Sequence, residues 1–334
     1  MANVIPRPET ITKLRYAADS AFAMLAGMQL DVFTPLKEGP KTIEDIASDL
    51  GINSSRLHLL MYSLVDGGLL TEDQGLFSNT PEAHQFLVKG SPAYIGDWHS
   101  TFSNRWIRNL KIAESIRSGK PVAKLDFSNS PEEELEKYFR RINLLTVAAA
   151  HSLLERYDFS STKTLADVGC GAAGIALTVT NACPHIQATA IDLPQVVPIT
   201  QKIIDSEGAT QRIRVLTADV LSGSLPGAYD TVVLRAVLQV LSSEDARLAV
   251  KNVAPAVRRG GTIYIIGHIL DDTRTSPPEA LGFNLTSISQ FDSGESYTEQ
   301  EHRSWLSEAG FTDIECSNFM LADEHRVMIA RQPA

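Results

Sequence analysis

The chain has 334 residues, a formal net charge of −10, 43% hydrophobic residues and 21% charged residues. This length predicts two domains, the composition is that of a soluble globular protein, and the excess of acidic groups disfavours nucleic acid as a partner. No apolar run reaches the roughly 18 to 20 residues that a membrane span requires. The first residues lack the apolar stretch of a secretory signal, and three cysteines are too few for a disulfide framework or a zinc site. We therefore expect a cytoplasmic protein without a membrane partner or a structural metal.

The first part of the chain has a helical pattern. Residues 12–30 place apolar side chains at helical spacing, and shorter helices are expected over 42–51 and 54–67. The stretch 69–80 alternates around a turn and predicts a small hairpin. Helix, helix and hairpin is the order of a winged helix. Further helices are expected around 92–118 and 131–156.

From Thr164 onward, apolar strands alternate with helical stretches. This alternation predicts an α/β domain, in which a mostly parallel sheet carries helices on both faces. The segments FTDIECSNF and HRVMIARQ predict antiparallel strands that close the sheet. We expect a helical domain over 1–155 and the sheet domain over 156–334.

The segment Asp167-Val168-Gly169-Cys170-Gly171-Ala172-Ala173-Gly174 follows the first apolar strand and precedes a helix. Glycines at this point let the backbone turn sharply and approach a ligand closely. The motif alone is weak evidence, because it also marks nicotinamide and flavin sites.

Three acidic residues narrow the choice of ligand. The second strand ends in Asp192, 18 residues after Gly174, where a carboxylate can accept hydrogen bonds from both hydroxyls of a ribose. The third strand is expected to end in Asp219, which with Val220 is placed to meet an adenine. A buried carboxylate at Asp167 would repel a pyrophosphate but suits an ammonium and a sulfonium. This pattern favours S-adenosylmethionine over a dinucleotide.

The segments DVGCGAAG, AIDLP, TADVL and LRAVLQVLSSEDA, in this order, resemble those of class I S-adenosylmethionine-dependent methyltransferases. Together with the winged helix, they resemble the plant-type O-methyltransferase family over nearly the whole chain. The resemblance implies a Rossmann-like methyltransferase sheet behind an N-terminal helical dimerisation domain. It also implies a small-molecule acceptor and S-adenosylhomocysteine as the product of the cofactor.

The resemblance also implies roles for individual residues. Gly169 and Gly171 line the methionine portion of the cofactor, Asp192 with Leu193 meets the ribose, and Asp219 with Val220 meets the adenine. Arg235 stands where the family usually has a lysine near the cofactor. Because the N-terminal helices have more apolar surface than one small domain can bury, we expect a homodimer formed through residues 12–30 and 92–118.

The sequence departs from the family at the catalytic base. The family usually carries a histidine after the fourth strand, and this chain has Gln239 there, which cannot act as a base near neutral pH. The acidic residue that orients the histidine is also missing, and His268 lies near its position. His268 is either a displaced base or a hydrogen-bonded histidine at a strand end.

Loss of the base favours an acceptor that has no proton to lose. A thioether is such a nucleophile, so we expect S-methylation of a small carboxylated thioether. In size and layout the chain resembles the methylthiohydroxybutyrate S-methyltransferases of dimethylsulfoniopropionate synthesis. Bacteriochlorophyllide C-methyltransferases of the wider family also lack the histidine. The alternatives are O-methylation of a phenolic or enolic hydroxyl with His268 as base, C-methylation, and a non-methylating reaction that retains the cofactor.

Two stretches rich in polar and aromatic residues are candidates for contacts with the acceptor. An arginine would bind a carboxylate, and aromatic faces would attract a developing sulfonium. The same tryptophans are equally explained as residues of a dimer core. A DNA-binding role is disfavoured, because the second helix of the winged helix has one Arg and one His and is otherwise apolar. The candidate acceptor residues are Trp98, Arg105, Trp106, Tyr138, Arg141, Asn143 and His151.

Overall fold

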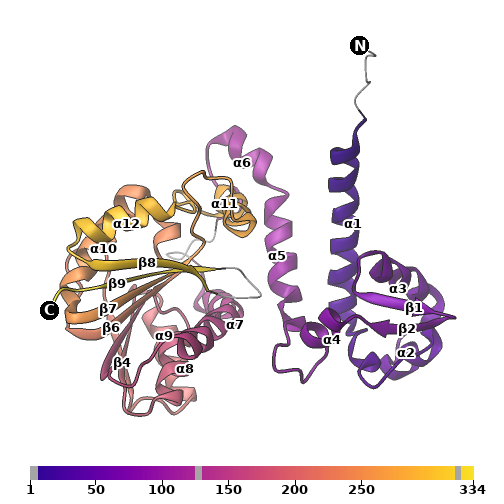
Figure 1. The fold of residues 1–334 in the computed structure, drawn as a ribbon, viewed down its shortest axis with the longest axis horizontal. Helices are drawn as coiled ribbons and strands as arrows, with labels where there is room; N and C mark the ends of the chain where they lie inside the picture. Colours follow the sequence, from indigo (N-terminus) through magenta and orange to yellow (C-terminus); the bar gives the residue numbers. More distant parts are fainter. Residues whose placement is uncertain (1–6, 125–129, 320–324) are drawn as a thin grey trace. The chain divides into compact units, whose positions relative to one another are not determined.

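The computed structural model describes residues 7–124, 130–319 and 325–334. The chain forms two compact units, Met1–Trp106 and Ile107–Ala334, which are coloured along the sequence in Figure 1. We expected the division near residue 155. It lies earlier because the helix α7 (Glu132–Arg156) buries Ala149, Ala150 and Leu153 in the same apolar cluster as the sheet.

The N-terminal unit has the expected order of helix, helix and hairpin. Thr42 accepts a hydrogen bond from the backbone N–H of Asp45, and Gly51 ends the same helix with a φ of 63°. The two strands of the hairpin pair antiparallel. The elements of this region are α1 (Glu9–Leu30), α2 (Ile43–Leu50), α3 (Leu57–Asp66), β1 (Leu70–Asp73), β2 (Leu76–Asn79), α4 (Pro81–Leu87) and α5 (His99–Asn109), with short 3-10 helices at Thr34–Leu36, Ser54–Arg56 and Gly96–Trp98.

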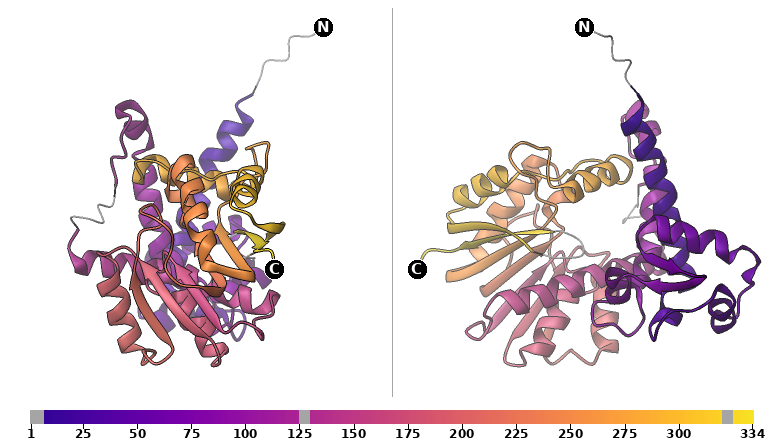
Figure 2. Two further views of the ribbon diagram at one scale, coloured as in Figure 1. Left: turned by 90° about the vertical axis from the view of Figure 1, so that its left-hand side faces the viewer. Right: turned by 45° about the vertical axis from the view of Figure 1, so that its right-hand side comes forward.

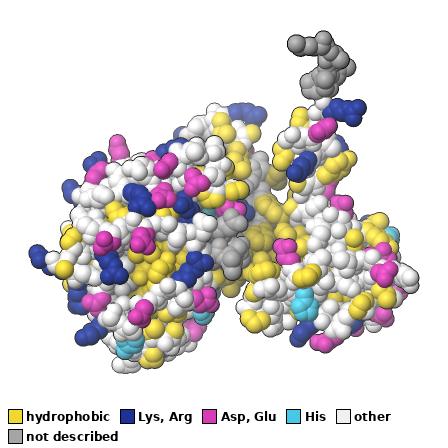
Figure 3. All heavy atoms as spheres, viewed as in Figure 1, with side chains coloured by type: hydrophobic (Ala, Val, Ile, Leu, Met, Phe, Trp, Pro, Cys, Tyr) yellow, Lys and Arg dark blue, Asp and Glu magenta, His cyan; other side chains and the backbone are white. Residues whose placement is uncertain are grey.

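The helix α1 leaves much of its apolar surface uncovered. Ile11, Leu14, Tyr16 and Phe22 are 72%, 68%, 56% and 59% exposed. Figure 3 shows apolar side chains next to charged ones along this helix. The buried core of the unit instead lies under α2, α3 and the hairpin. An apolar face of this kind is typical of a protein–protein contact.

The second unit contains a seven-stranded sheet in the order β5-β4-β3-β6-β7-β9-β8. The strands from β5 to β7 are parallel, and β9 runs antiparallel to both β7 and β8. The predicted, mostly parallel sheet with closing antiparallel strands is confirmed. The strands are β3 (Thr164–Val168), β4 (Gln187–Asp192), β5 (Ile213–Thr217), β6 (Tyr229–Arg235), β7 (Val257–Gly267), β8 (Thr312–Asn318) and β9 (Arg326–Arg331).

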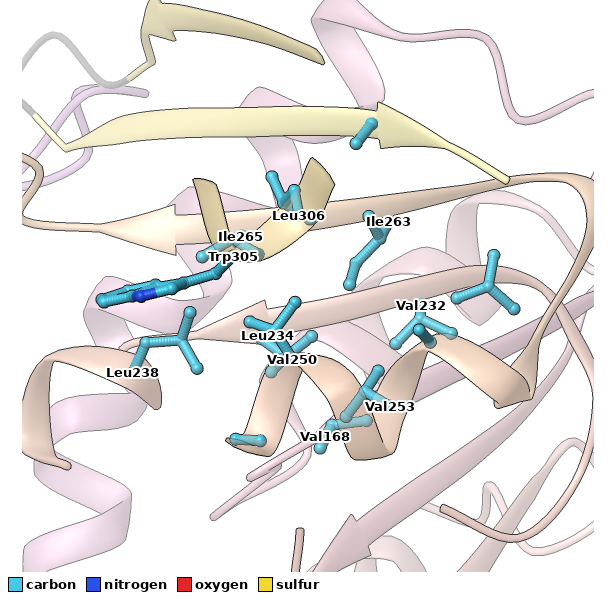
Figure 4. Packing of buried hydrophobic residues seen from close by; sticks show 14 of the residues in the cluster. Val168, Val232, Leu234, Leu238, Val250, Val253, Ile263, Ile265, Trp305 and Leu306 are labelled. Atoms are coloured by element: carbon cyan, nitrogen blue, oxygen red, sulfur yellow. The ribbon is translucent and has the colours of Figure 1, made fainter. Parts of the chain in front are cut away.

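Helices cover both faces of this sheet, as Figure 2 shows. Successive strand residues point to opposite faces, so that Leu234 and Val233 belong to different apolar clusters. In Figure 4, Val250 and Val253 of α10 (Ser243–Val253) and Leu306 of α12 (Glu299–Glu308) pack over one face. The helices α7, α8 (Gly174–Ala182) and α9 (Val197–Ser206) cover the other face.

Two further helices complete the unit: α6 (Ile112–Ser118) packs against α11 (Pro278–Gln290). The strand order reverses at β3, which has β4 on one side and β6 on the other. Ligands of open parallel sheets bind at the carboxyl ends of the strands at such a point. Within the described residues, no helix is both long enough and apolar enough to cross a bilayer.

Candidate functional site

The glycine loop leaves the carboxyl end of β3 in a conformation that favours glycine. Gly169 and Gly171 have φ values of 68° and 51°. A Cβ atom on Gly169 would lie 2.5 Å from Cγ2 of Val237, and one on Gly171 would lie 2.9 Å from Cδ1 of Phe139. Both glycines are therefore required by backbone conformation and by close packing. The sequence predicted the glycines but not the side chains that pack against them.

Asp167 is a buried acid on β3, with 1% of its surface exposed. Its Oδ2 accepts a hydrogen bond from the N–H of Ala176 in the first turn of α8 at 3.1 Å. Burial, together with the negative charge of Asp192, raises the pKa of Asp167 to about 7, although the Ala176 N–H and the positive charge of Arg235 oppose the rise. A cation bound beside this carboxyl would favour its ionised form.

Asp192 is the last residue of β4, as predicted. Its Oδ2 accepts a hydrogen bond from the N–H of Gly171 at 2.7 Å, and its Oδ1 accepts one from the N–H of Leu193 at 2.8 Å. Burial raises the pKa of Asp192, and these two N–H groups oppose the rise. Each carboxylate oxygen has a further lone pair, so the group can still accept hydrogen bonds from a ligand.

Asp219 does not end its strand, which corrects the sequence prediction. The strand β5 ends at Thr217, and Asp219 lies in the loop that follows. Its carboxylate accepts hydrogen bonds from the N–H of Leu221 at 2.8 Å and from Oγ of Ser222 at 2.9 Å, which shape the loop. Val220 is half-buried and packs against the core of the sheet.

Arg235 and Asn143 approach the glycine loop from other elements. Arg235 is the last residue of β6, the neighbour of β3, and its charge acts on Asp167. Asn143, on α7, lies so close to Gly174 that a Cβ atom there would be 2.3 Å from its Oδ1. That oxygen is buried and accepts no hydrogen bond from the residues that the structure describes. It is an acceptor that a ligand ammonium group would satisfy.

These features fit S-adenosylmethionine. Three acids lie at or just beyond the carboxyl ends of the adjacent strands β3, β4 and β5, and within the described ranges none forms an ion pair with Lys or Arg. Acidic groups suit ribose hydroxyls, an amino group and a cationic tail, and they disfavour a pyrophosphate.

Comparison with known proteins identifies the family. Residues 119–312 match the O-methyltransferase domain, and residues 17–89 match the O-methyltransferase dimerisation domain. The chain belongs to the O-methyltransferase family. It is a methyltransferase whose cofactor is S-adenosylmethionine, as the resemblance implied.

The names of the relatives of this methyltransferase specify methylation at different atoms. It is 26% identical to the 3-hydroxy-5-methyl-1-naphthoate 3-O-methyltransferase of Streptomyces sahachiroi, over 93% of this chain and 92% of the relative. It is also 26% identical to the L-tyrosine C(3)-methyltransferase of Streptomyces lavendulae, over 87% and 84%. Human N-acetylserotonin methyltransferase in complex with S-adenosylmethionine has the same fold, with a TM-score of 0.74, 21% identity and full coverage of both chains.

Gln239 lies in a short 3-10 helix (Leu238–Val240) after β6 and is buried. Its Oε1 accepts a hydrogen bond from the backbone N–H of His268 at 3.0 Å. A Cβ atom on Gly267 would lie 2.4 Å from the same oxygen. The amide therefore holds the end of β7 in place.

His268 is the first residue after β7. Its ring stacks on Phe283 of α11, with the centroids 4.9 Å apart, and lies 4.3 Å from the ring of His325. His325 is buried immediately before β9. The sequence analysis did not single out His325, because nothing local in the sequence marks two histidines this far apart as neighbours.

Three of the candidate acceptor residues belong to the N-terminal unit. Trp98 is buried and meets Phe102 edge-on at 6.4 Å, while Trp106 stacks on Phe102 at 6.3 Å and meets Phe22 of α1 edge-on at 5.7 Å. Arg105 is exposed on α5. The two tryptophans thus form an aromatic cluster that joins α5 to α1.

The other candidates lie on α7 in the second unit. The guanidinium carbon of Arg141 lies 5.6 Å from the ring centroid of Tyr138, so these two side chains share a helix face as predicted. Asn143 reaches the glycine loop. His151 is exposed further along the helix. The structure therefore brings Tyr138 and Arg141 together, places Asn143 at the glycine loop and leaves His151 at the surface.

Proposed function

We propose that this methyltransferase acts on a small acceptor whose nucleophilic atom loses no proton, and that the acceptor is a carboxylated thioether. The observation that carries the proposal is Gln239. By the sequence resemblance it stands where the family usually carries a histidine. It has no ionisable group, and its amide oxygen accepts a hydrogen bond from the His268 N–H. A residue fixed in this way can orient neighbouring groups but cannot remove a proton from a hydroxyl.

The cofactor would be held along the edge built by the glycine loop and the acids. Asp192 and Leu193 would meet the ribose, and Asp219 and Val220 the adenine. Asp167, Gly169, Gly171 and Arg235 would surround the methionine portion. When bound, S-adenosylmethionine supplies the methyl group, which turns the accepting sulfur into a sulfonium without release of a proton.

The protein would contribute to this reaction through orientation and electrostatics. Holding two reactants in line supplies much of the acceleration in a displacement of this kind. The ring of Phe139 lies beside the glycine loop, the ring of Tyr138 lies 5.4 Å from it, and aromatic faces here would attract a sulfonium product. Asp167 favours a positive charge in the same region once it is ionised.

A second candidate is O-methylation with His268 as the base. It is favoured by the position of His268 one residue after β7, next to Gln239 and in ring contact with His325. C-methylation is a third candidate, because one relative is named L-tyrosine C(3)-methyltransferase.

The test is the pH dependence of turnover with saturating methyl-labelled cofactor. Matched acceptors are 4-(methylthio)butanoate and 4-hydroxybenzoate, with the methylated atom located by mass spectrometry. For the thioether we expect a kcat that is level from about pH 6 to about pH 8, and a His268→Ala variant that retains it. If only the hydroxyl is methylated, and His268→Ala abolishes that turnover while cofactor binding persists, then His268 is the base and the thioether proposal is wrong.

We also propose that the enzyme is a homodimer that associates through α1 and the region 92–118. The match to a dimerisation domain and the exposed apolar side chains of α1 support this, as do Leu110 and Ile116, which are 83% and 65% exposed. Phe22→Glu should shift sedimentation toward the monomer, whereas Leu248→Glu, on α10 of the second unit, should not. A wild-type enzyme that sediments as an active monomer at micromolar concentration would contradict the proposal.

A further inference from the structure

The side chain of Tyr138 is buried, its ring lies 5.6 Å from the guanidinium carbon of Arg141, and the charges of two further arginines also act on it. Arg108 lies near the end of α5, Arg141 lies on α7, and Arg235 ends β6. Burial raises the pKa of Tyr138, and the positive charges of these three arginines oppose that rise. Burial also lowers the pKa of Arg141, and the charge of Arg108 lowers it further. Two guanidinium groups thus repel one another in a half-buried position.

The position of Arg108 is fixed by a polar contact and by packing. Its Nη1 donates a hydrogen bond to Oε1 of Gln290 at 2.5 Å. Gln290 is buried at the end of α11, which packs against α6, the helix that follows Arg108 in the chain. The backbone N–H of Ala123 also donates to the carbonyl of Ser289 at 2.9 Å. The segment that carries Arg108 is therefore held against α11.

Neither Arg108 nor Arg141 forms an ion pair with a carboxylate of the described residues. Arg140, the residue before Arg141, is the contrast: its Nε lies 2.8 Å from Oε1 of Glu136. Other described arginines, such as Arg258 with Asp230, are paired in the same way. Half-buried positive charges that repel one another and lack a carboxylate are stabilised by an anion, and a guanidinium binds a carboxylate through two parallel hydrogen bonds.

The neighbours of Arg141 on α7 lie beside the glycine loop. Phe139 follows Tyr138 in the chain and lies against Gly171, where an added Cβ atom would meet it. Asn143 comes two residues after Arg141 and lies against Gly174 in the same way. The charge of Arg235 acts on both Tyr138 and Asp167. An anion bound by Arg141 would therefore be near the glycine loop, where the methionine portion of the cofactor is proposed to bind.

We propose that Arg108 and Arg141 bind the carboxylate of the acceptor, and that Gln290 is a positioning residue that holds Arg108. The inference rests on the proposed function, because it assigns this subsite to the substrate that receives the methyl group. It names the substrate class as small carboxylic acids and excludes their neutral analogues. It holds for a thioether acid and for a hydroxy acid alike, so it can be tested separately from the atom that is methylated.

The test compares each acid with its amide. The acceptors are 4-(methylthio)butanoate and 4-hydroxybenzoate with their primary amides, assayed by kcat/KM with methyl-labelled cofactor and the full chain. We expect the wild type to prefer the acid by about tenfold to a hundredfold, the range of charge-assisted hydrogen bonds. Arg108→Met and Arg141→Met should each lose most of that preference by raising KM for the acid, while KM for the amide changes by less than about threefold.

Five further variants separate positioning and folding from binding. Arg140→Met is the matched control, because Arg140 is paired with Glu136, and it should keep the preference for the acid. Gln290→Glu places a carboxylate beside Arg108 and should reduce the preference more than Gln290→Leu does. Arg108→Lys and Arg141→Lys keep the charge without the planar guanidinium, so their preference for the acid should lie between those of the wild type and the Met variants. The Lys variants also test the subsite if a Met variant fails to fold.

The outcomes distinguish this proposal from the proposed function. If only the hydroxy acid is methylated, but its preference over the amide disappears in the arginine variants, the subsite is confirmed and the thioether proposal fails. If thioethers are methylated equally as acid and amide, and the arginine variants behave as wild type, the subsite is wrong and the thioether proposal stands. Equal losses for acid and amide in both the Met and the Lys variants also overturn the subsite.

Discussion

The proposed cofactor edge and the proposed acceptor side of this methyltransferase are built in different ways. The cofactor edge consists of the loop after β3 and the ends of β4 and β5, and it depends on positive φ angles and backbone N–H groups. The proposed acceptor side consists of side chains from α5, α7, α11, the 3-10 helix after β6 and the end of β7, which are far apart in the sequence. Backbone geometry tolerates few substitutions, whereas side chains can be exchanged while the fold is kept. This difference accounts for one family that includes O- and C-methyltransferases.

The largest effect is expected at the glycine loop. Gly171→Val forces a branched side chain into the left-handed region and against Phe139, which together cost about 2 to 4 kcal/mol. Affinity for S-adenosylmethionine should then fall by about a hundredfold or more, as measured by titration calorimetry. Gly208→Val is the control, because Gly208 has a φ of 64° but a Cβ atom added to it would meet no atom within 4 Å. Equal affinities for the two variants would refute a special role for the loop.

A smaller loss is expected at the ribose position. Asp192→Ala removes an acceptor of charge-assisted hydrogen bonds, which are worth about 1.5 to 3 kcal/mol, so cofactor affinity should fall about tenfold to a hundredfold. Asp205→Ala, at a surface acid of α9, should bind the cofactor as the wild type does. Unchanged binding by the Asp192 variant would show that the ribose does not contact this residue.

The pKa of Asp167 predicts how cofactor binding depends on pH. Because this pKa is raised to about 7 and a cationic ligand prefers the carboxylate, affinity should fall by up to about tenfold per pH unit below pH 7. In the free enzyme, the raised pKa of Asp167 means that the protonated carboxyl favours the folded state. This contribution to the free energy of unfolding is fully present below about pH 4 and is lost as the pH rises through about 7. Calorimetric titrations at about pH 6 and about pH 8 test the binding. Asp167→Asn should give the same affinity at both, and a steep dependence in that variant would assign the proton to another group.

The smallest effect is expected on the acceptor side, at Gln239. Gln239→Ala leaves the His268 N–H without its acceptor, which should lower the free energy of unfolding by about 1 to 3 kcal/mol. Turnover of the true acceptor should change by no more than about fivefold, the equivalent of one hydrogen bond. Gln239→His should not raise that turnover. A large gain in the histidine variant would show that the reaction needs a base after all.

The cofactor edge could be predicted from the sequence because its determinants are local. A glycine loop between a strand and a helix, and Asp192 at the next strand end, are visible within short windows. The prediction that Asp219 ends its strand was wrong, because a strand end is defined by pairing with its neighbour, and β5 stops at Thr217. The division between the units was misplaced for a similar reason: α7 reads as one more helix of the first part of the chain, and only its packing assigns it to the sheet.

By itself the sequence determined the alternation of strands and helices and the glycine loop, and it led to the proposals that three acids hold the cofactor and that Gln239 stands in place of the family histidine. Only the tertiary structure decided which side chains surround these residues: Val237 and Phe139 against the loop, His325 against His268, and Gln290 against Arg108. The physical reason is the range of the interactions. Backbone conformation is set largely by neighbours in the sequence, whereas Arg108 and Gln290 meet only because the fold packs α6 against α11.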